Sequence, residues 1–261
     1  MNIVVCIKQV PDTTDVKIDK KTNTLVRKGV ESIINPYDMH AIEEGLRIKE
    51  NTGGKVTVIS MGPSQVKDSL KEAVALGVDE VILLSDRAFA GSDTLATSYT
   101  LARGIAKIAN VDLILCGKQA IDGDTAQVGP GIAEHLQLPH ATYVDEILTI
   151  NKEFITVKKK IENGYEKLEL QLPALLTVIK DINEVRLPYI RGIIRAREIE
   201  IPIWTADDLD IDIDATGLDG SPTQVISIDT PQINPEGKIY EGDAQEQVKQ
   251  LINELNEQQI F

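Results

Sequence analysis

Short apolar runs alternate with amphipathic stretches over roughly the first 145 residues of the chain. Residues 3–7, 56–61, 80–84 and 112–116 are the apolar runs, whereas residues 38–51, 64–76 and 92–109 carry apolar side chains at helical spacing. Strands that are almost continuously Val, Ile and Leu, alternating with such helices, are typical of a parallel sheet covered on both sides. The pattern therefore predicts an α/β fold: an open, mostly parallel, doubly wound sheet with helices on both faces.

The pattern changes after this region. Residues 154–161 and 165–172 alternate apolar with charged side chains around Asn163-Gly164. Asn-Gly between alternating runs is the strongest short signal for a β-hairpin. Residues 175–179 then form one more apolar run, which indicates a buried strand. We expect a single α/β domain over residues 1–200 with this added β-hairpin.

Residues 201–261 have a different composition. From Pro202 to the end, thirteen acidic residues face only two lysines, and apolar runs are few. Such a segment buries too little apolar surface to form a second core. It is either a disordered tail or an extended C-terminal arm that orders on another subunit. Apolar residues at helical spacing within 243–255 favour the arm, ending in a helix.

The chain as a whole is strongly acidic, with 41 Asp and Glu against 27 Lys and Arg and a formal charge of −14. This charge opposes binding to a nucleic-acid backbone or an anionic membrane surface. No apolar run reaches the roughly 20 residues that span a bilayer. We therefore expect no nucleic-acid partner and no membrane insertion. The N-terminus enters a strand-like run without the features of a secretory leader, which indicates a cytoplasmic protein.

The metal-binding and nucleophilic side chains form no recognisable set. Cys6 and Cys116 each lie at the end of an apolar run, where a small buried side chain is the simplest interpretation. The two cysteines and three histidines lack metal-ligand spacing. No paired carboxylates or nucleophile–base pair indicate hydrolysis. Any redox chemistry would therefore need an organic cofactor.

Ligands of open α/β sheets bind beyond the carboxyl ends of the strands. The richest segment in such a position is GKQAIDGDTAQVGP, residues 117–130. Its glycines at 117, 123 and 129 permit sharp turns and close approach of a ligand to the backbone. A helix that starts at Thr125 or at Pro130 would point free N–H groups at the loop mouth, which suits a phosphate. We expect a branched side chain at Gly123 to displace this loop from a phosphate.

Two carboxylates in this segment oppose phosphate binding. Asp122 and Asp124 are better suited to capping the following helix or holding ribose hydroxyls. The spacing matches neither of the two common glycine-rich phosphate motifs. From these residues alone, a nucleotide site and an ordinary strand-to-helix connection both remain open.

Other polar residues lie before helices at the same expected edge. Asn35 and Asp38 flank Pro36-Tyr37, and Asp38 is favoured as the N-cap of the helix, with a direct ligand contact as the alternative. Met61 ends a strand, and Thr94 and Thr97 begin another helix. Convergence of helix N-termini on one sheet edge is a property of the fold and is weak evidence for a ligand.

Together, the segments VCIKQVPD, NPYD, ISMGP and GKQAIDGDTAQVGP resemble the β subunit of electron transfer flavoproteins. The four segments occur in the family's order, and the resemblance extends over the whole chain, including the hairpin and the C-terminal arm. It implies a heterodimer with an α subunit that carries its own FAD. It also implies an adenine nucleotide on this chain: AMP in housekeeping members and a second FAD in electron-bifurcating members.

Mapped onto this sequence, the resemblance implies cofactor-binding residues and a partner-docking loop over about 181–197. The cofactor-binding residues are Cys6, Asn35, Tyr37, Asp38, Met61, Thr94, Thr97, Gly117, Gln119, Asp122, Gly123, Asp124, Thr125, Ala126, Gln127 and Val128. The docking residues are Arg186, Tyr189, Ile190 and Arg191, with Ile190 where the family commonly has an exposed leucine.

The small residues Gly123, Thr125 and Ala126, with Thr94 and Thr97 beyond them, resemble the bifurcating branch. That branch implies NADH as electron donor, ferredoxin or flavodoxin as one acceptor, and the α-subunit FAD as the other. The α-subunit FAD then reduces an acyl-CoA dehydrogenase-like or other flavin dehydrogenase. A housekeeping β subunit with structural AMP and a nucleotide-binding regulatory module are the alternatives.

Overall fold

The computed structural model describes residues 1–12, 18–19, 24–25, 32–226 and 237–260. The chain divides into two compact units, Met1–Ile226 and Ser227–Phe261. The first unit contains the α/β domain, and the second contains helix α6 (Ala244–Glu257). None of the described helices has the length and apolar character to cross a membrane.

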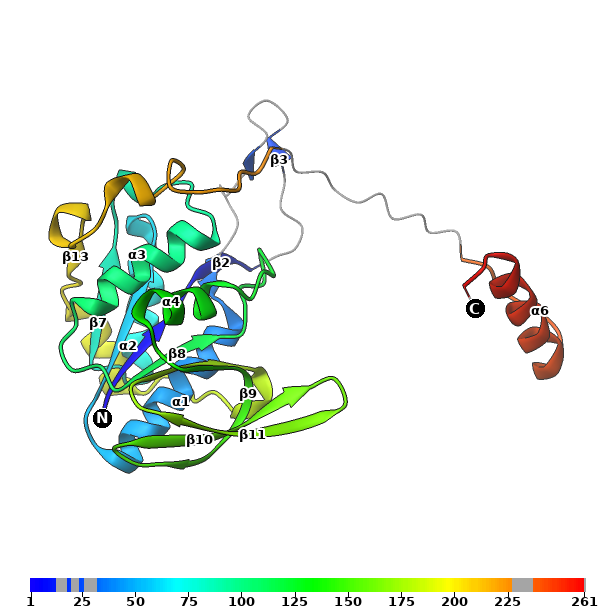
Figure 1. The fold of residues 1–261 in the computed structure, drawn as a ribbon, viewed down its shortest axis with the longest axis horizontal. Helices are drawn as coiled ribbons and strands as arrows, with labels where there is room; N and C mark the ends of the chain where they lie inside the picture. Colours follow the sequence, from blue (N-terminus) through cyan, green and yellow to red (C-terminus); the bar gives the residue numbers. More distant parts are fainter. Residues whose placement is uncertain (13–17, 20–23, 26–31, 227–236, 261) are drawn as a thin grey trace. The chain divides into compact units, whose positions relative to one another are not determined.

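A nine-stranded sheet is the largest sheet among the described residues (Figure 1). In spatial order its strands are β11 (Gly164–Gln171), β10 (Phe154–Ile161), β9 (His140–Ile150), β12 (Ala174–Val178), β8 (Leu113–Gly117), β1 (Asn2–Cys6), β6 (Lys55–Met61), β7 (Glu80–Leu84) and β13 (Ile203–Trp204). From β9 to β13 all neighbours are parallel, and the antiparallel hairpin β10–β11 extends the sheet beyond β9. The predicted doubly wound sheet and its hairpin are confirmed.

Helices cover both faces of this sheet, as predicted. On one face, α1 (Pro36–Thr52) and α2 (Lys67–Leu76) pack against one apolar core; on the other, α3 (Thr94–Ala106) and α4 (Val128–Leu136) pack against a second. In β1, Ile3 and Val5 enter the first core while Val4 and Cys6 enter the second. This two-residue alternation explains why the strand is apolar throughout: both faces are buried.

Short elements complete the first unit. They are the antiparallel pair β2 (Gln9–Pro11) and β5 (Ser32–Ile34), the antiparallel pair β3 (Ile18–Asp19) and β4 (Thr24–Leu25), and the 3₁₀ turns η1 (Ser64–Val66), η2 (Arg87–Phe89), η3 (Lys180–Ile182), η4 (Ala206–Asp208) and η5 (Ile213–Ala215).

Two elements differ from the sequence-based expectation. Strand β9 was not predicted, because only Ala141 and Val144 along it are fully buried and its apolar pattern is broken. The expected docking loop contains a helix, α5 (Ile190–Glu198), which packs on α2. At Gly192 a Cβ would lie 2.3 Å from the carbonyl oxygen of Ala75, so glycine permits this close helix contact.

The acidic segment 201–226 is part of the first unit rather than a separate arm. Its strand β13 pairs in parallel with β7, and its side chains Trp204 and Leu209 pack in the core beside α3. The compact unit therefore extends to Ile226, beyond the composition change near residue 200. Residues 227–236 of the expected arm lie outside the described residues, and α6 agrees with the helix predicted over 243–255.

Candidate functional site

The carboxyl ends of the central strands bring the predicted cofactor residues together. Cys6, Met61 and Gly117 end β1, β6 and β8, which are neighbours in the sheet. The chain proceeds from β1 to β6 and β7 on one side and then returns to place β8 on the other side of β1. The loops after β1 and β8 therefore diverge at a topological switch point, where open α/β sheets bind ligands. We call residues 117–127, from the last residue of β8 to the start of α4, the cofactor loop.

Asn35 and Asp38 fasten the cofactor loop to the end of β1. The side-chain amide of Asn35 donates to the carbonyl of Gln119 (2.8 Å), and its oxygen accepts from the N–H of Ile121 (3.1 Å). The carboxylate of Asp38 accepts from the N–H groups of Lys8 (2.7 Å) and Gly117 (3.1 Å). Helix α1 starts at Pro36 with Asn35 at the N-cap position, so the favoured interpretation of Asp38 as the N-cap is wrong.

Asp38 is a buried acid, with its side chain beneath the loop. Burial raises the pKa of Asp38 to about 7, opposed by the hydrogen bonds from Asn35, Lys8 and Gly117. The group therefore changes its charge near neutral pH while holding the ends of β1 and β8.

Lys8 contacts the cofactor loop and was not among the predicted site residues. Its ammonium group lies 2.6 Å from the carboxylate of Asp122 and forms an ion pair with it. Gln119 donates to the carboxylate of Asp124 (2.5 Å). Neither carboxylate caps α4, and the Lys8 pair compensates one of the two charges that oppose phosphate binding. Lys8 lies just after the carboxyl end of the first strand, and this position is the sequence feature that could have indicated a place in the site.

The last part of the cofactor loop presents free backbone donors. Among the described residues, the N–H groups of Thr125, Ala126, Gln127 and Val128 donate to no protein acceptor. Helix α4 begins at Val128, so neither predicted start, Thr125 or Pro130, is correct. Ala126 has a φ of 53° and Gln127 is right-handed helical, a sequence of conformations that turns successive N–H groups into a concavity for anions.

The glycine requirement falls on Gly117 rather than Gly123. A Cβ at Gly117 would lie 2.2 Å from Oδ1 of Asp38 and 2.7 Å from Tyr37. At Gly129 it would lie 2.5 Å from the Thr177 side chain. Gly123 has no positive φ, and a Cβ there would meet nothing within 4 Å. The structure therefore gives no steric reason for the effect expected from a side chain at Gly123.

The N-terminus of α3 adjoins the cofactor loop. Asp93 caps the helix by accepting from the N–H groups of Leu95 (2.9 Å) and Ala96 (3.1 Å). The hydroxyl of Thr94 donates to the side-chain oxygen of Gln127 (2.9 Å). This contact connects two predicted cofactor residues, whereas the Thr97 side chain makes no hydrogen bond with the described residues.

The remaining predicted residues flank these contacts. The ammonium group of Lys118 lies over two aromatic rings. It is 5.4 Å from the ring centroid of Tyr37 and 5.1 Å from that of Tyr143. Cys6 pairs in register with Cys116, and both are buried free thiols. The Cys6 thiol and burial raise the pKa of Cys116, which keeps that thiol protonated.

The predicted docking residues divide into two groups. Arg186 is held within the chain, 2.8 Å from Glu43 and 2.5 Å from Glu50. Ile190 is 78% exposed, and Leu187, which sequence reasoning did not select, is 86% exposed. Leu187 and Ile190 flank Pro188 and Tyr189 and form the most exposed apolar pair at the start of α5.

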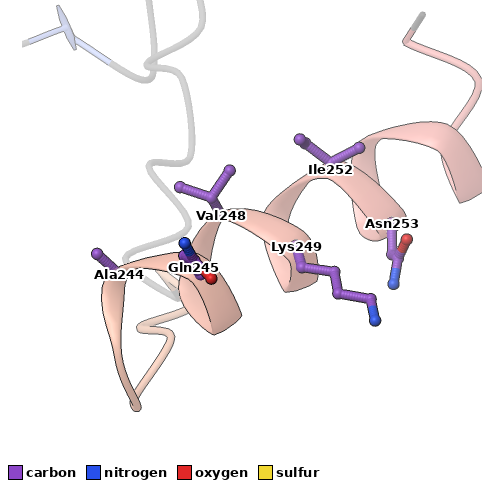
Figure 2. A pocket seen from close by; sticks show the side chains of 6 residues that line it. All are labelled: Ala244, Gln245, Val248, Lys249, Ile252 and Asn253. Carbon is purple, nitrogen blue, oxygen red and sulfur yellow. The ribbon is translucent and has the colours of Figure 1, made fainter.

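Two surface hollows are formed by other residues. One runs along the apolar side of α6, where Val248 and Ile252 point in the same direction (Figure 2). The other lies between α2 and the segment Ile199–Ile203 and includes Lys67 and Lys71. Neither contains a predicted cofactor residue. Within the described residues, no three His, Cys, Asp or Glu side chains form a metal cluster.

Comparison with known proteins identifies the family. Residues 22–209 match the profile of the electron transfer flavoprotein domain. Over the full length of both proteins, the chain is 51% identical to an electron transfer flavoprotein subunit beta from Thermoanaerobacterium thermosaccharolyticum and 49% identical to the caffeyl-CoA reductase-Etf complex subunit CarD from Acetobacterium woodii. It is 44% identical to protein FixA from Sinorhizobium fredii, over 98% of this chain and 92% of that protein. The chain belongs to the electron transfer flavoprotein family, among its β subunits, and functions in electron transfer with an α-subunit partner.

Proposed function

We propose that this chain is the β subunit of an electron-bifurcating electron transfer flavoprotein and holds FAD in its cofactor loop. The αβ pair takes electrons from NADH in the cytoplasm. It divides them between ferredoxin or flavodoxin and the α-subunit FAD, which passes electrons to an acyl-CoA dehydrogenase-like or other flavin dehydrogenase.

The free N–H groups at the end of the cofactor loop are the observation that supports the proposal most. Four consecutive residues, 125–128, offer backbone donors without a protein acceptor among the described residues. Such donors at a helix start bind phosphate oxygens. Beside them, Gly123 is exposed, with open space where a side chain would be. These features suit a pyrophosphate with a bulky extension.

The chain's own residues position this set of donors. Asn35 and Asp38 hold the first half of the loop against β1, and Lys8 compensates the charge of Asp122. Thr94 and Thr97 lie in the first turns of α3, where Thr94 contacts the loop through Gln127. A flavin bound here supplies hydride acceptance and one-electron transfer, chemistry that the side chains at this edge do not provide.

Two relatives have names other than electron transfer flavoprotein subunit beta. One belongs to a caffeyl-CoA reductase-Etf complex, and another is a FixA protein; the chain is 49% and 44% identical to them. These identities are close to the 51% shared with an electron transfer flavoprotein subunit beta. The identity values alone do not separate the branches, so the proposal depends on the loop.

A housekeeping β subunit with structural AMP is the second candidate. The hydrogen bond between Thr94 and Gln127 spans the space between the cofactor loop and α3. This bridge favours a mononucleotide, because a second phosphate beyond the loop would have to displace it. Family membership argues against the third alternative, a regulatory module on the same scaffold.

The nucleotide content of the purified αβ pair separates the two candidates. We expect two FAD per pair, one of them on this chain, and bleaching of the flavin absorbance by NADH without oxygen. Gly117→Ala, which places a Cβ against Asp38, should release one FAD and leave the α-subunit FAD in place. One FAD and one AMP per wild-type pair would contradict the bifurcating proposal and leave the family assignment intact.

A further inference from the structure

Asp93 uses its two carboxylate oxygens for different segments of the chain. Oδ1 caps α3 through Leu95 and Ala96. Oδ2 accepts from the backbone N–H (3.0 Å) and the hydroxyl (2.8 Å) of Thr223, which lies 130 residues further along the chain. In addition, the N–H of Asp93 donates to the hydroxyl of Ser221 (2.8 Å). We call Asp93, Ser221 and Thr223 the latch.

The latch adjoins the cofactor loop through one residue. Thr94, next to Asp93, donates its hydroxyl to Gln127. The first turn of α3 therefore contacts the cofactor loop at Thr94 and the C-terminal segment at Asp93. Because one helix turn serves both contacts, its fraying or reorientation would disturb both of them.

Among the described residues 216–226, the latch is the last attachment by hydrogen bonds to the rest of the first unit. Before it, the hydroxyl of Thr216 lies 2.7 Å from the carbonyl of Ile213 and 3.2 Å from that of Ala88, contacts that do not involve α3. After it, Val225 and Ile226 are 79% and 91% exposed, and the first unit ends at Ile226. Whether the latch hydrogen bonds are formed therefore determines whether residues 219–226 stay packed on the first unit.

We propose that Asp93 is a positioning residue that couples nucleotide occupancy of the cofactor loop to the ordering of residues 219–226; this rests on the proposed function of the loop. The first turn of α3 has two arrangements. In one, Asp93 caps the helix and holds Thr223. In the other, the turn frays and the segment is released. A nucleotide that orders Gln127 and Thr94 favours the closed arrangement, and closing the latch tightens nucleotide binding by the same factor.

Two variants separate the latch from the helix cap. Asp93→Ser keeps an effective N-cap, because serine and aspartate are similarly favoured there, but its shorter side chain cannot also reach Thr223. Thr223→Val removes only the hydroxyl donor and preserves the side-chain shape. Thr216→Val is the matched control, because it loosens the same segment at Ala88 without touching α3.

Hydrogen exchange of the full-length chain with and without AMP or FAD tests the coupling. In the wild type and in Thr216→Val, nucleotide should slow exchange in peptides covering residues 219–226. Thr223→Val, which keeps the backbone N–H bond to Asp93, should weaken this effect. Asp93→Ser should lose it and bind nucleotide about fivefold more weakly, a modest coupling.

Two outcomes separate failure of this proposal from failure of the proposed function. Wild-type chain that binds neither AMP nor FAD would overturn both. Normal nucleotide binding with no change in exchange at residues 219–226, or with Thr223→Val indistinguishable from the wild type, would overturn the coupling alone. If Asp93→Ser fails to fold, the Thr223→Val result decides.

Discussion

At the residue scale, Gly117 faces the strictest steric demand in the site. A Cβ there would press on Oδ1 of Asp38, the atom that accepts the N–H of Gly117 itself. We expect Gly117→Ala to lower the free energy of unfolding by about 1–3 kcal/mol, the usual cost of overpacking, and to abolish nucleotide binding on this chain. Urea denaturation and a nucleotide-binding titration measure the two effects.

Gly123→Ala is the matched control. Its Cβ would enter open space, and the residue has no positive φ, so the free energy of unfolding should change by no more than about 0.5 kcal/mol. A larger loss of stability in Gly123→Ala than in Gly117→Ala would show that the two glycines have been ranked in the wrong order.

Asp38 makes stability depend on pH near neutrality. Because burial raises its pKa from 3.8 to about 7, the folded chain holds an extra proton at this group between about pH 4 and pH 7. The free energy of unfolding contributed by Asp38 therefore falls as pH rises through this window.

The variant Asp38→Asn isolates that effect, since an amide does not titrate. It should be less stable than the wild type at pH 5, because its NH₂ group would face the N–H of Lys8 or Gly117. The difference in unfolding free energy should be smaller at pH 8, where the wild-type carboxylate is ionised. Equal differences at the two pH values would mean that Asp38 titrates in the ordinary range.

At the element scale, β13 determines where the foldable unit ends. Truncation after Pro202 removes Trp204 and Leu209 from the core and uncovers the edge of β7. Loss of the buried Leu209 side chain alone costs about 2–5 kcal/mol, and an uncovered strand edge promotes aggregation. Truncation after Ile226 removes only the second unit, so its denaturation midpoint should match that of the full chain. Similar midpoints for the two truncated chains would contradict a structural role for residues 203–226.

At the scale of the whole molecule, α6 is notable for a stripe of apolar side chains on its surface. Val248, Leu251 and Ile252 are between 43% and 54% exposed on one side of it, in a chain with a formal charge of −14. Burying such a stripe against another surface removes apolar side chains from water and therefore stabilises the contact. We therefore propose that α6 binds the α subunit.

Co-purification with the α subunit tests this role. Ile252→Asp should weaken pairing as strongly as truncation after Ile226, whereas Asn253→Asp, on the neighbouring polar position in Figure 2, should pair normally. Normal pairing by the truncated chain would rule out α6 as an anchor.

The sequence by itself determined the parts of the fold whose pattern is local. Strands β1, β6, β7 and β8 are buried on both faces, so continuous apolar runs reveal them without knowledge of their neighbours. The cofactor loop was located because it follows such a strand. The Asn-Gly hairpin was predicted from its turn chemistry.

Only the tertiary structure decided features that depend on contacts between distant segments. Strand β9 has a broken apolar pattern and lies between β12 and β10, and the Arg-rich segment of α5 packs its helix on α2. Asp38 reads locally as a helix cap, but it instead binds N–H groups 30 and 79 residues away. The demand for glycine at 117, and not at 123, likewise follows from where Asp38 lies. A sequence pattern indicates whether a segment is buried, but it does not show which distant side chain will accept the hydrogen bond of a given backbone N–H group.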